Sequence, residues 1–552
     1  MPEPRETDLR IECALFLGVF AVYLFCVYPF AAPRDSADLA LAAARVGVAH
    51  PPGYPLYALV GRLWIAVVPL GNIAYRLDLL SAAAGAGACV LLYFIARRRA
   101  SPIIAASAAL ALAWSAPLWK FSLLCEMYSL HALFLASLLY LCEGDAQSLR
   151  GRASLSSFLC GLGLVNHQSL ILFLPAWLWL WRAELERHGV APGEHARRAG
   201  AFFFLGLSVY AFVWLRLGDL ALALAVITRR EYGTFTLSGG FARALSIGGF
   251  LMLLRYACVE TVSAAGALAA LLAACGGWDL WKKDRTFAKG LLLGLVVCGP
   301  LFILATRFDL SEWPARSVLE PAFLSPAVFI CLLAAAGLEA LKRAEPKVVL
   351  PLALLVGFAP LLLRSGLMDH REDFSAYDYL RDLRRELPPG SSVLIGGDTA
   401  LFGLKYFEQV SPRTAPLNLV SSREVPDPSW SARAREKGRV FVLGLPLDAL
   451  SVWGLVDAKR RPQPQGLVQE VLPESPGIGH EREAWKLSTL RWGPALASGE
   501  SYAHDVRLSY AFAHYLSARL EELGGPGEPI EHDRWARLLD PEDYRLAPAA
   551  GN

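Results

Sequence analysis

Residues 11–38 read IECALFLGVFAVYLFCVYPFAAPRDSAD, an apolar run followed at once by charged side chains. An apolar run of about 20 residues is long enough to cross a bilayer as a helix, and it exceeds the apolar core of most signal peptides. A retained membrane helix is therefore the prediction, with cleavage near Ala31 as the alternative. Asp35 and Asp38 stand where the chain first leaves the membrane.

Composition extends this interpretation to most of the chain. Of 552 residues, 55% are hydrophobic, and the mean hydropathy is +0.39. The formal charge of +3 is small, and no run of Lys or Arg suggests a nucleic-acid surface, so the lipid bilayer is the predicted partner and nucleic acid is not. Ten cysteines without CxxC spacing indicate neither a zinc site nor a disulfide framework.

Hydropathy predicts an α-helical polytopic membrane domain over residues 1–365, with a first outer loop at 31–76 and about eleven transmembrane helices. After the first run, the predicted spans are 77–96, 102–119, 121–142, 154–166, 169–181, 199–217, 248–275, 290–306, 317–341 and 348–363. Residues 56–68, interrupted by Arg62, predict an interfacial helix instead. The segments 154–166 and 169–181 are either two short helices or one long one.

The sequence pattern of the tail, residues 366–552, predicts a soluble α/β domain. Helices are expected at 375–387 and 506–523, buried strands at 393–398 and 440–444, and polar loops at 424–439 and 458–466. Lys and Arg are denser in the loops that lie on the same side of the membrane as the N-terminus than in the loops on the other side, most clearly at 97–99 and 282–285. The positive-inside rule then places the N-terminus in the cytoplasm, and the acidic first loop and the tail outside.

The first loop carries the strongest candidates for chemistry. Asp35 and Asp38 are three residues apart, so they share a face if the chain turns helical after Pro33, with Arg34 close enough to tune them. This spacing suits a base and a supporting acid acting on a lipid-borne substrate. It equally suits an ordinary helix N-cap at a membrane interface. The segment from His50 to Tyr54, HPPGY, is either a rigid loop that projects both side chains or a simple turn.

Polar residues inside apolar spans are the next candidates. Glu126 precedes Tyr128 and His131, and an acid there is costly unless it pairs with Lys120 or faces a polar cavity. Asn166 and His167 interrupt another apolar run. Such a histidine is either a hydrogen-bonding residue between helices or part of a site.

A cationic segment in a predicted outer loop completes the set. Arg229 and Arg230, close to Tyr232, could bind a phosphate or pyrophosphate bidentately. Lipid headgroups would attract the same arginines. Two carboxylates in one loop are too few to assign a metal, so no cofactor is predicted. The need for a divalent metal ion is left open.

Five segments, in this order, resemble a known family: RDSADL, AHPPGYPLYALVGRL, NIAYRLDLLSA, EMYSLHALF and GLGLVNHQS. They are similar to a bacterial membrane family whose eukaryotic relative is a transmembrane protein O-mannosyltransferase, within the GT-C glycosyltransferases. The resemblance covers residues 12–180 well, and a weaker patch, GGDTALFGLKYFEQV, lies within 366–410.

The resemblance implies a catalytic acid in the first outer loop and inverting transfer of a sugar, a hexose such as mannose, from a polyprenyl-phosphate donor to an extracytoplasmic hydroxyl, for example a protein Ser or Thr. Asp35 would be the base. The family usually has Glu where this chain has Asp38, which puts the role of Asp38 in doubt. The implied location is the bacterial inner membrane. A transporter or flippase of polyprenyl-linked sugars is the alternative function, and a non-catalytic assembly protein is a third.

Overall fold

The structure is a computed structural model that describes most of the chain: residues 6–233, 246–310, 313–412, 415–423, 429–445, 453, 455, 460–473, 501–522, 534–536 and 539. It forms two compact units that do not follow chain order. The first comprises Met1–Val27, Ala42–Gly71 and Tyr75–Arg371, and the second comprises Tyr28–Leu41, Asn72–Ala74 and Glu372–Asn552. Two pieces of the first outer loop thus group with the tail.

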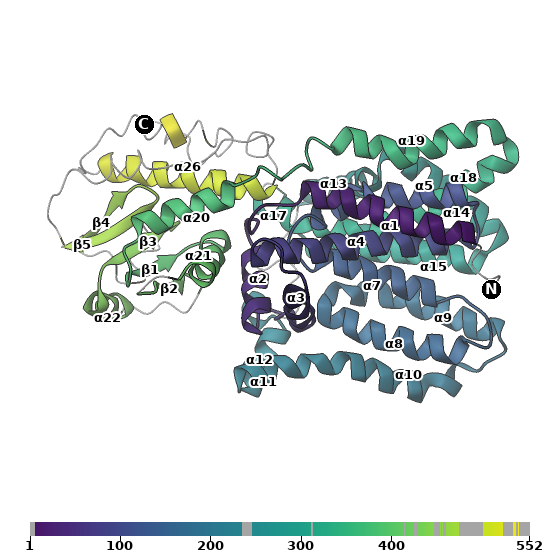
Figure 1. Cartoon of the computed structure of the whole chain (residues 1–552), viewed down its shortest axis with the longest axis horizontal. Coiled ribbons are helices and arrows are strands. Elements are labelled where there is room, and N and C mark those ends of the chain that lie inside the picture. The colour runs from purple at the N-terminus through teal and green to yellow at the C-terminus, as the bar shows by residue number, and fades with distance from the viewer. Residues whose placement is uncertain are drawn as a thin grey trace. The chain divides into compact units, whose positions relative to one another are not determined.

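The first unit is helical, and its long helices run along a shared direction (Figure 1). Its helices are α1 (Glu6–Cys26), α3 (Pro55–Val67), α4 (Ile73–Arg97), α5 (Pro102–Ala113), α6 (Ala116–Phe121), α7 (Tyr128–Leu141), α8 (Leu149–Asn166), α9 (Leu174–Arg187), α10 (Pro192–Leu207), α11 (Ala211–Leu217), α12 (Leu220–Ile227), α13 (Ile247–Ala265), α14 (Ala267–Lys283), α15 (Arg285–Val296), α16 (Phe302–Thr306), α17 (Trp313–Leu319), α18 (Leu324–Ala344) and α19 (Pro346–Arg364). The first residues of α4 group with the second unit, and α2 (Ser36–Arg45) is divided between the two units.

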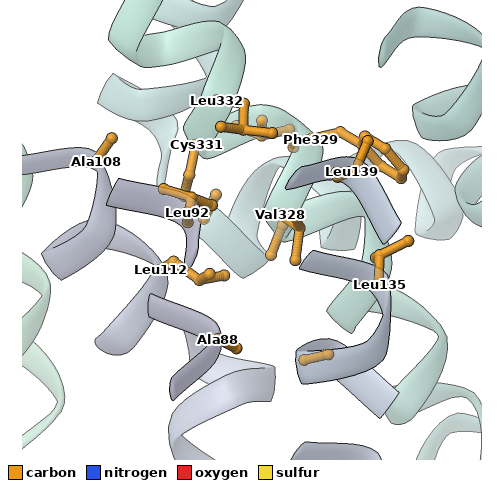
Figure 2. Close-up of a cluster of buried hydrophobic side chains, with 14 of the residues drawn as sticks. Ala88, Leu92, Ala108, Leu112, Leu135, Leu139, Val328, Phe329, Cys331 and Leu332 are labelled. Atoms are coloured by element: carbon orange, nitrogen blue, oxygen red, sulfur yellow. The ribbon is translucent and has the colours of Figure 1, made fainter. Parts of the chain in front are cut away.

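The core of this unit forms where α4, α5 and α7 meet α18. Figure 2 shows Leu92, Leu112, Leu135 and Val328 from these four helices gathered in one cluster. Every residue of α18 from Pro326 to Leu338 is buried, as expected of a helix that is apolar on all sides. Helix α18 is therefore central to the bundle.

Six helical segments among the described residues are long and apolar enough to cross a membrane. They are Ile73–Arg97, His195–Leu217, Ile247–Ala265, Arg285–Thr306, Arg316–Ala344 and Pro346–Arg364. The three apolar helices α3, α5 and α7 are shorter. The protein is thus mostly helical with several candidate membrane spans, while the number eleven stays a prediction.

Several predicted spans are interrupted. The single span expected at 248–275 is wrong, because α13 ends at Ala265 and α14 begins at Ala267, with Gly266 between them at φ 95°. The segment 102–119 likewise divides into α5 and α6. Of the two alternatives for 154–181, the structure favours separate helices, since α8 ends at Asn166 and a 3₁₀ turn over Gln168–Phe173 precedes α9.

The second unit contains a five-stranded mixed sheet in the order β2-β1-β3-β5-β4. Its described elements are α20 (Ser375–Glu386), β1 (Ser392–Ile395), α21 (Asp398–Val410), β2 (Asn418–Ser421), α22 (Trp430–Lys437), β3 (Val440–Leu443), β4 (Arg460–Gln465), β5 (Val468–Pro473) and α26 (Ser501–Glu522). Strand β1 pairs in parallel with β2 and β3, and β5 pairs antiparallel with β3 and β4. Every residue of β1 and β3 is buried, which explains why all of them except Ser392 are apolar.

Two segments expected to be polar loops carry regular structure. Within 424–439, residues 424–428 lie outside the described residues, but α22 follows at Trp430–Lys437. Within 458–466, Arg460–Gln465 form β4, which pairs along its length with β5. Strand β4 is at the edge of the sheet, where a strand tolerates proline because fewer of its N–H groups need a partner.

Candidate functional site

Asp35 stands at the start of a helix, as expected from the sequence. Helix α2 begins at Ser36, and the carbonyl oxygen of Asp35 accepts a hydrogen bond from the backbone N–H of Leu39 at 3.0 Å. Asp38 lies in the first turn of α2, and both aspartates are half-buried. Arg34, just before them, has a left-handed backbone with φ 69°. This placement agrees with the N-cap alternative for Asp35, and it leaves its role as a base a prediction.

The loop from His50 to Tyr54 is a compact turn in the first unit. The backbone N–H of Gly53 donates to the carbonyl oxygen of His50 at 2.8 Å, and Gly53 has a φ of 93°, which a residue with a side chain rarely adopts. A Cβ atom at Gly53 would lie 3.4 Å from side-chain carbons of Val213 and Val226. The turn therefore packs closely against α11 and α12, which agrees with the rigid-loop alternative.

An aromatic cluster centred on His167 brings together candidates from three distant segments. The ring of His167 stacks on Tyr54 with centroids 6.2 Å apart, and it contacts Tyr128 at 5.2 Å and His131 at 5.6 Å. The ring of His50 is 5.0 Å from that of Tyr54. We call these five residues the His167 cluster. All five were predicted as site residues from the sequence.

Short hydrogen bonds fix the orientation of the two central histidines. His167 Nδ1 lies 2.6 Å from Ser169 Oγ, and His131 Nε2 lies 3.2 Å from Ser325 Oγ. Asn166 donates through Nδ2 to the carbonyl oxygen of Met127 at 3.1 Å, which joins α8 to the start of α7. Asn166 therefore holds two segments of the cluster together.

The cationic segment lies near the cluster through Arg229. The guanidinium of Arg229 interacts electrostatically with the His167 imidazole. Arg229 and Arg230 are exposed, and Arg230 begins the short 3₁₀ turn that ends at Tyr232. The structure thus brings Arg229 toward His167, and it leaves Arg230 at the surface.

Gln168 and Tyr210 secure this arrangement and were not predicted from the sequence. Gln168 Nε2 donates to the carbonyl oxygen of Ile227 at 2.8 Å and to Tyr210 Oη at 3.1 Å. Tyr210 Oη in turn donates to the carbonyl oxygen of Leu164 at 3.1 Å. These bonds fasten the end of α12, just before Arg229, to the end of α8.

Two acids are buried near the start of α7. Glu126 is 1% exposed, and its carbonyl oxygen accepts a hydrogen bond from Ser81 Oγ at 3.2 Å. Asp78, in α4, is fully buried against the backbone of Cys125. Lys120, the partner expected for Glu126, forms an ion pair with Glu320 at 2.6 Å. Asp78 was missed, although an acid inside an apolar span is itself a signal of function.

Metal ligands do not gather in the described part of the chain. No group of three His, Cys, Asp or Glu side chains is placed there to hold an ion. The arrangement instead offers imidazole, phenol and guanidinium groups, which suit hydrogen bonding to hydroxyls and anions.

Comparison with known protein sequences finds similarity to protein O-mannosyl-transferases. The family described as "Protein O-mannosyl-transferase TMEM260 N-terminal domain" matches residues 35–188. Two curated proteins of that name are similar, from Mus musculus (28% identical, covering 74% of this chain) and Dictyostelium discoideum (23% identical, covering 71%). The alignments cover only 62% and 55% of those proteins, so the chain spans less than two thirds of their length. Both organisms are eukaryotes, and neither match supports the expected bacterial origin.

Solved structures with related arrangements include the mycobacterial arabinofuranosyltransferase AftD, with a TM-score of 0.48 and 16% identity over 79% of this chain and 35% of that one. The archaeal oligosaccharyltransferase AglB from Archaeoglobus fulgidus gives a TM-score of 0.45 and 12% identity over 80% of this chain and 70% of that one. By sequence, the chain is thus similar to the TMEM260 protein O-mannosyl-transferases over a region that begins at Asp35 and includes the whole His167 cluster.

Proposed function

We propose that the protein is an inverting GT-C glycosyltransferase. It moves a sugar, a hexose such as mannose, from a polyprenyl-phosphate donor to an extracytoplasmic hydroxyl, and the name of its relatives favours a protein Ser or Thr as acceptor. The enzyme crosses the membrane several times, with a cytoplasmic N-terminus and an extracytoplasmic C-terminal unit. The sequence resemblance favours a bacterial inner membrane, although the matched relatives are eukaryotic.

The observation that carries this proposal is the convergence of the His167 cluster. Residues 50–54, 128–131 and 167 belong to three of the five segments on which the resemblance rests, and their rings lie within contact of one another. Packing alone does not need three histidines and two tyrosines at one place. All five residues also lie inside the stretch that matches the O-mannosyl-transferase family.

The proposed chemistry is a single displacement at the anomeric carbon. A Ser or Thr hydroxyl is a poor nucleophile at neutral pH, so Asp35 accepts its proton as the oxygen attacks. The bond between the anomeric carbon and the phosphate oxygen breaks, and the lipid phosphate leaves with the electron pair. Arg229 or Arg230 stabilises the charge of that phosphate. Attack opposite the leaving group inverts the configuration. A lipid phosphate is a good leaving group, so the step does not require a divalent metal.

The test is turnover by Asp35→Asn with a panel of polyprenyl-phosphate sugars. Asparagine keeps the size of the side chain but cannot accept the proton, so kcat is expected to fall by about 100-fold or more. Asp145→Asn is the matched control, because Asp145 is an exposed aspartate that bonds to the backbone N–H of Ser148 at 2.8 Å. Both variants should insert into the membrane at wild-type levels.

Two outcomes would count against the proposal. Full activity of Asp35→Asn would remove Asp35 from the mechanism. If the wild-type protein released no lipid phosphate from any donor but moved a labelled polyprenyl-phosphate sugar across vesicles, the transporter alternative would replace the transferase.

A further inference from the structure

The loop that carries Asp35 is attached to α21 at two places within the second unit. The backbone N–H of Arg34, the residue before Asp35, donates to Thr399 Oγ1 at 3.1 Å. Thr399 is in the first turn of α21. A side-chain hydroxyl thus fixes the peptide next to the proposed base.

The second attachment runs through Tyr406, on the same helix. Its hydroxyl accepts a hydrogen bond from the backbone N–H of Ala74 at 3.0 Å and donates to Asn72 Oδ1 at 3.2 Å. Asn72 Nδ2 donates in turn to the carbonyl oxygen of Pro29 at 2.8 Å. Tyr406 is fully buried, so these bonds are shielded from water.

Aromatic contacts of Phe30 also hold the loop to the second unit. The ring of Phe30 lies 5.5 Å from Tyr406, 5.1 Å from Tyr377 and 5.7 Å from Phe407. Phe30 is 8% exposed. The loop is therefore held before Asp35 by a ring cluster and by a chain of side-chain hydrogen bonds.

The sheet explains why Thr399 is available at this place. Helix α21 follows the carboxyl end of β1, a strand with parallel neighbours on both sides, and that edge is where α/β sheets present binding groups. The turn between them requires Gly397, at φ 104°, and Gly396, where a Cβ atom would lie 2.4 Å from the carbonyl oxygen of Gly444. These residues, with Thr399 and Tyr406, fall in the GGDTALFGLKYFEQV patch, to which the proposed chemistry assigns no role.

We propose that Thr399 and Tyr406 are positioning residues that hold the Asp35 loop in its working conformation, so that the C-terminal unit acts in catalysis by fixing the base. The expected effect on kcat rests on the proposed function, whereas the attachment of the loop does not. Effective general-base catalysis needs the carboxylate within hydrogen-bond reach of the acceptor proton, so a loosened loop lowers kcat.

The test uses Thr399→Val and Tyr406→Phe in the full-length protein. Each variant removes a hydroxyl and keeps the size of the side chain. Thr399→Val removes the bond to Arg34 and Tyr406→Phe removes the bonds to Ala74 and Asn72, and each change is expected to lower kcat about 2- to 10-fold. The KM for the donor should stay unchanged. Hydrogen–deuterium exchange in peptides covering 29–41 should become faster, which measures the loop without using activity.

Two further variants serve as controls. Thr399→Ser keeps the hydroxyl and should restore both kcat and slow exchange. Tyr377→Phe also removes a phenol next to Phe30, but within the described part of the chain the hydroxyl of Tyr377 makes no hydrogen bond to the loop. It should leave both quantities unchanged.

The outcomes separate this inference from the proposed function. Unchanged exchange in Thr399→Val and Tyr406→Phe would overturn the attachment of the loop. Faster exchange with unchanged kcat would overturn the positioning role and leave the transferase proposal intact. If Asp35→Asn kept full activity while exchange still responded, the proposed base would fail and the attachment would stand.

Discussion

At the scale of single residues, the fold opposes the ionisation of the Glu386 carboxyl group, in the second unit. Burial raises the pKa of Glu386 well above its usual value, and the nearby Asp382 adds to the rise. Hydrogen bonds from the backbone N–H groups of Leu467 and Val468 act in the opposite direction, the first at 2.8 Å. The folded protein therefore binds a proton more tightly at Glu386 than the unfolded chain does.

This shift predicts a pH-dependent loss of local stability. Below the unfolded pKa of about 4.3, both states are protonated and Glu386 has no effect on unfolding. As the pH rises above that value, only the unfolded chain releases its proton, so the stability of the unit falls until the folded pKa is reached. Glu386→Gln keeps an acceptor for Leu467 and should remove this loss.

Hydrogen–deuterium exchange of a peptide covering 467–471 measures the effect locally. Exchange in Glu386→Gln should be slower than in the wild type at pH 7 and equal to it near pH 4. Comparing both proteins at each pH cancels the intrinsic dependence of exchange on pH. An identical difference at the two pH values would show that folding does not raise the pKa of Glu386.

The candidate site was partly visible in the sequence, for a physical reason. Glu126 and His167 stand out because polar groups inside apolar runs are costly and need a partner or a role, and His50 stands out because it begins the HPPGY segment. Gln168 and Tyr210, which join the end of α12 to the end of α8, do not stand out, because their bonds to Ile227 and Leu164 depend on how these helices pack. A sequence shows which groups need hydrogen bonds, but not which backbone carbonyl will accept them.

At the scale of elements, α14 and α18 pack through glycines. A Cβ atom on Gly276 would lie 1.9 Å from the carbonyl oxygen of Leu333, and one on Gly337 would lie 2.0 Å from that of Leu272. Small residues at such crossings let two helix backbones approach closely. Gly276→Ala should therefore lower the free energy of unfolding by about 1–3 kcal/mol through overpacking.

Gly277→Ala is the matched control for this prediction. It is the next residue on the same helix, and a Cβ atom there would meet its nearest neighbours at 4.0 Å, an ordinary contact. Thermal unfolding of the purified protein in one detergent should show a lower midpoint for Gly276→Ala and little change for Gly277→Ala. Equal midpoints for the two variants would refute the close crossing of α14 and α18.

Helices and strands were predictable where the local pattern of apolar and polar residues was clear. The apolar runs in β1 and β3 and the amphipathic pattern of residues 506–523 predicted two strands and a helix, and the structure has β1, β3 and α26 there. Strand β4 was missed because its prolines favour a loop locally, whereas pairing with β5 at the sheet edge decides the outcome. Tertiary pairing of this kind cannot be seen in a local window.

At the scale of the whole molecule, the two units are interleaved along the chain. Residues of the first outer loop group with the tail through bonds such as that from Arg34 to Thr399, which are 365 positions apart. Composition alone suggested a simple division into a membrane domain followed by a soluble one. Long-range hydrogen bonds leave no trace in composition, so this part of the organisation needed the structure.

The topology proposed for the molecule makes a final prediction, because the C-terminal unit and the start of α19 should face opposite sides of the membrane. Lys405, on α21, and Lys347, at the start of α19, are both exposed. A cysteine introduced at either position can be labelled with a membrane-impermeant maleimide after the exposed Cys13, Cys258 and Cys275 are replaced by alanine, because the other seven cysteines are buried. Lys405→Cys should react in intact cells, and Lys347→Cys only after permeabilisation, because the denser Lys and Arg of the cytoplasmic loops resist translocation. The reverse pattern would place the Asp35 loop and the C-terminal unit in the cytoplasm, and a transfer reaction outside the cell would then be ruled out.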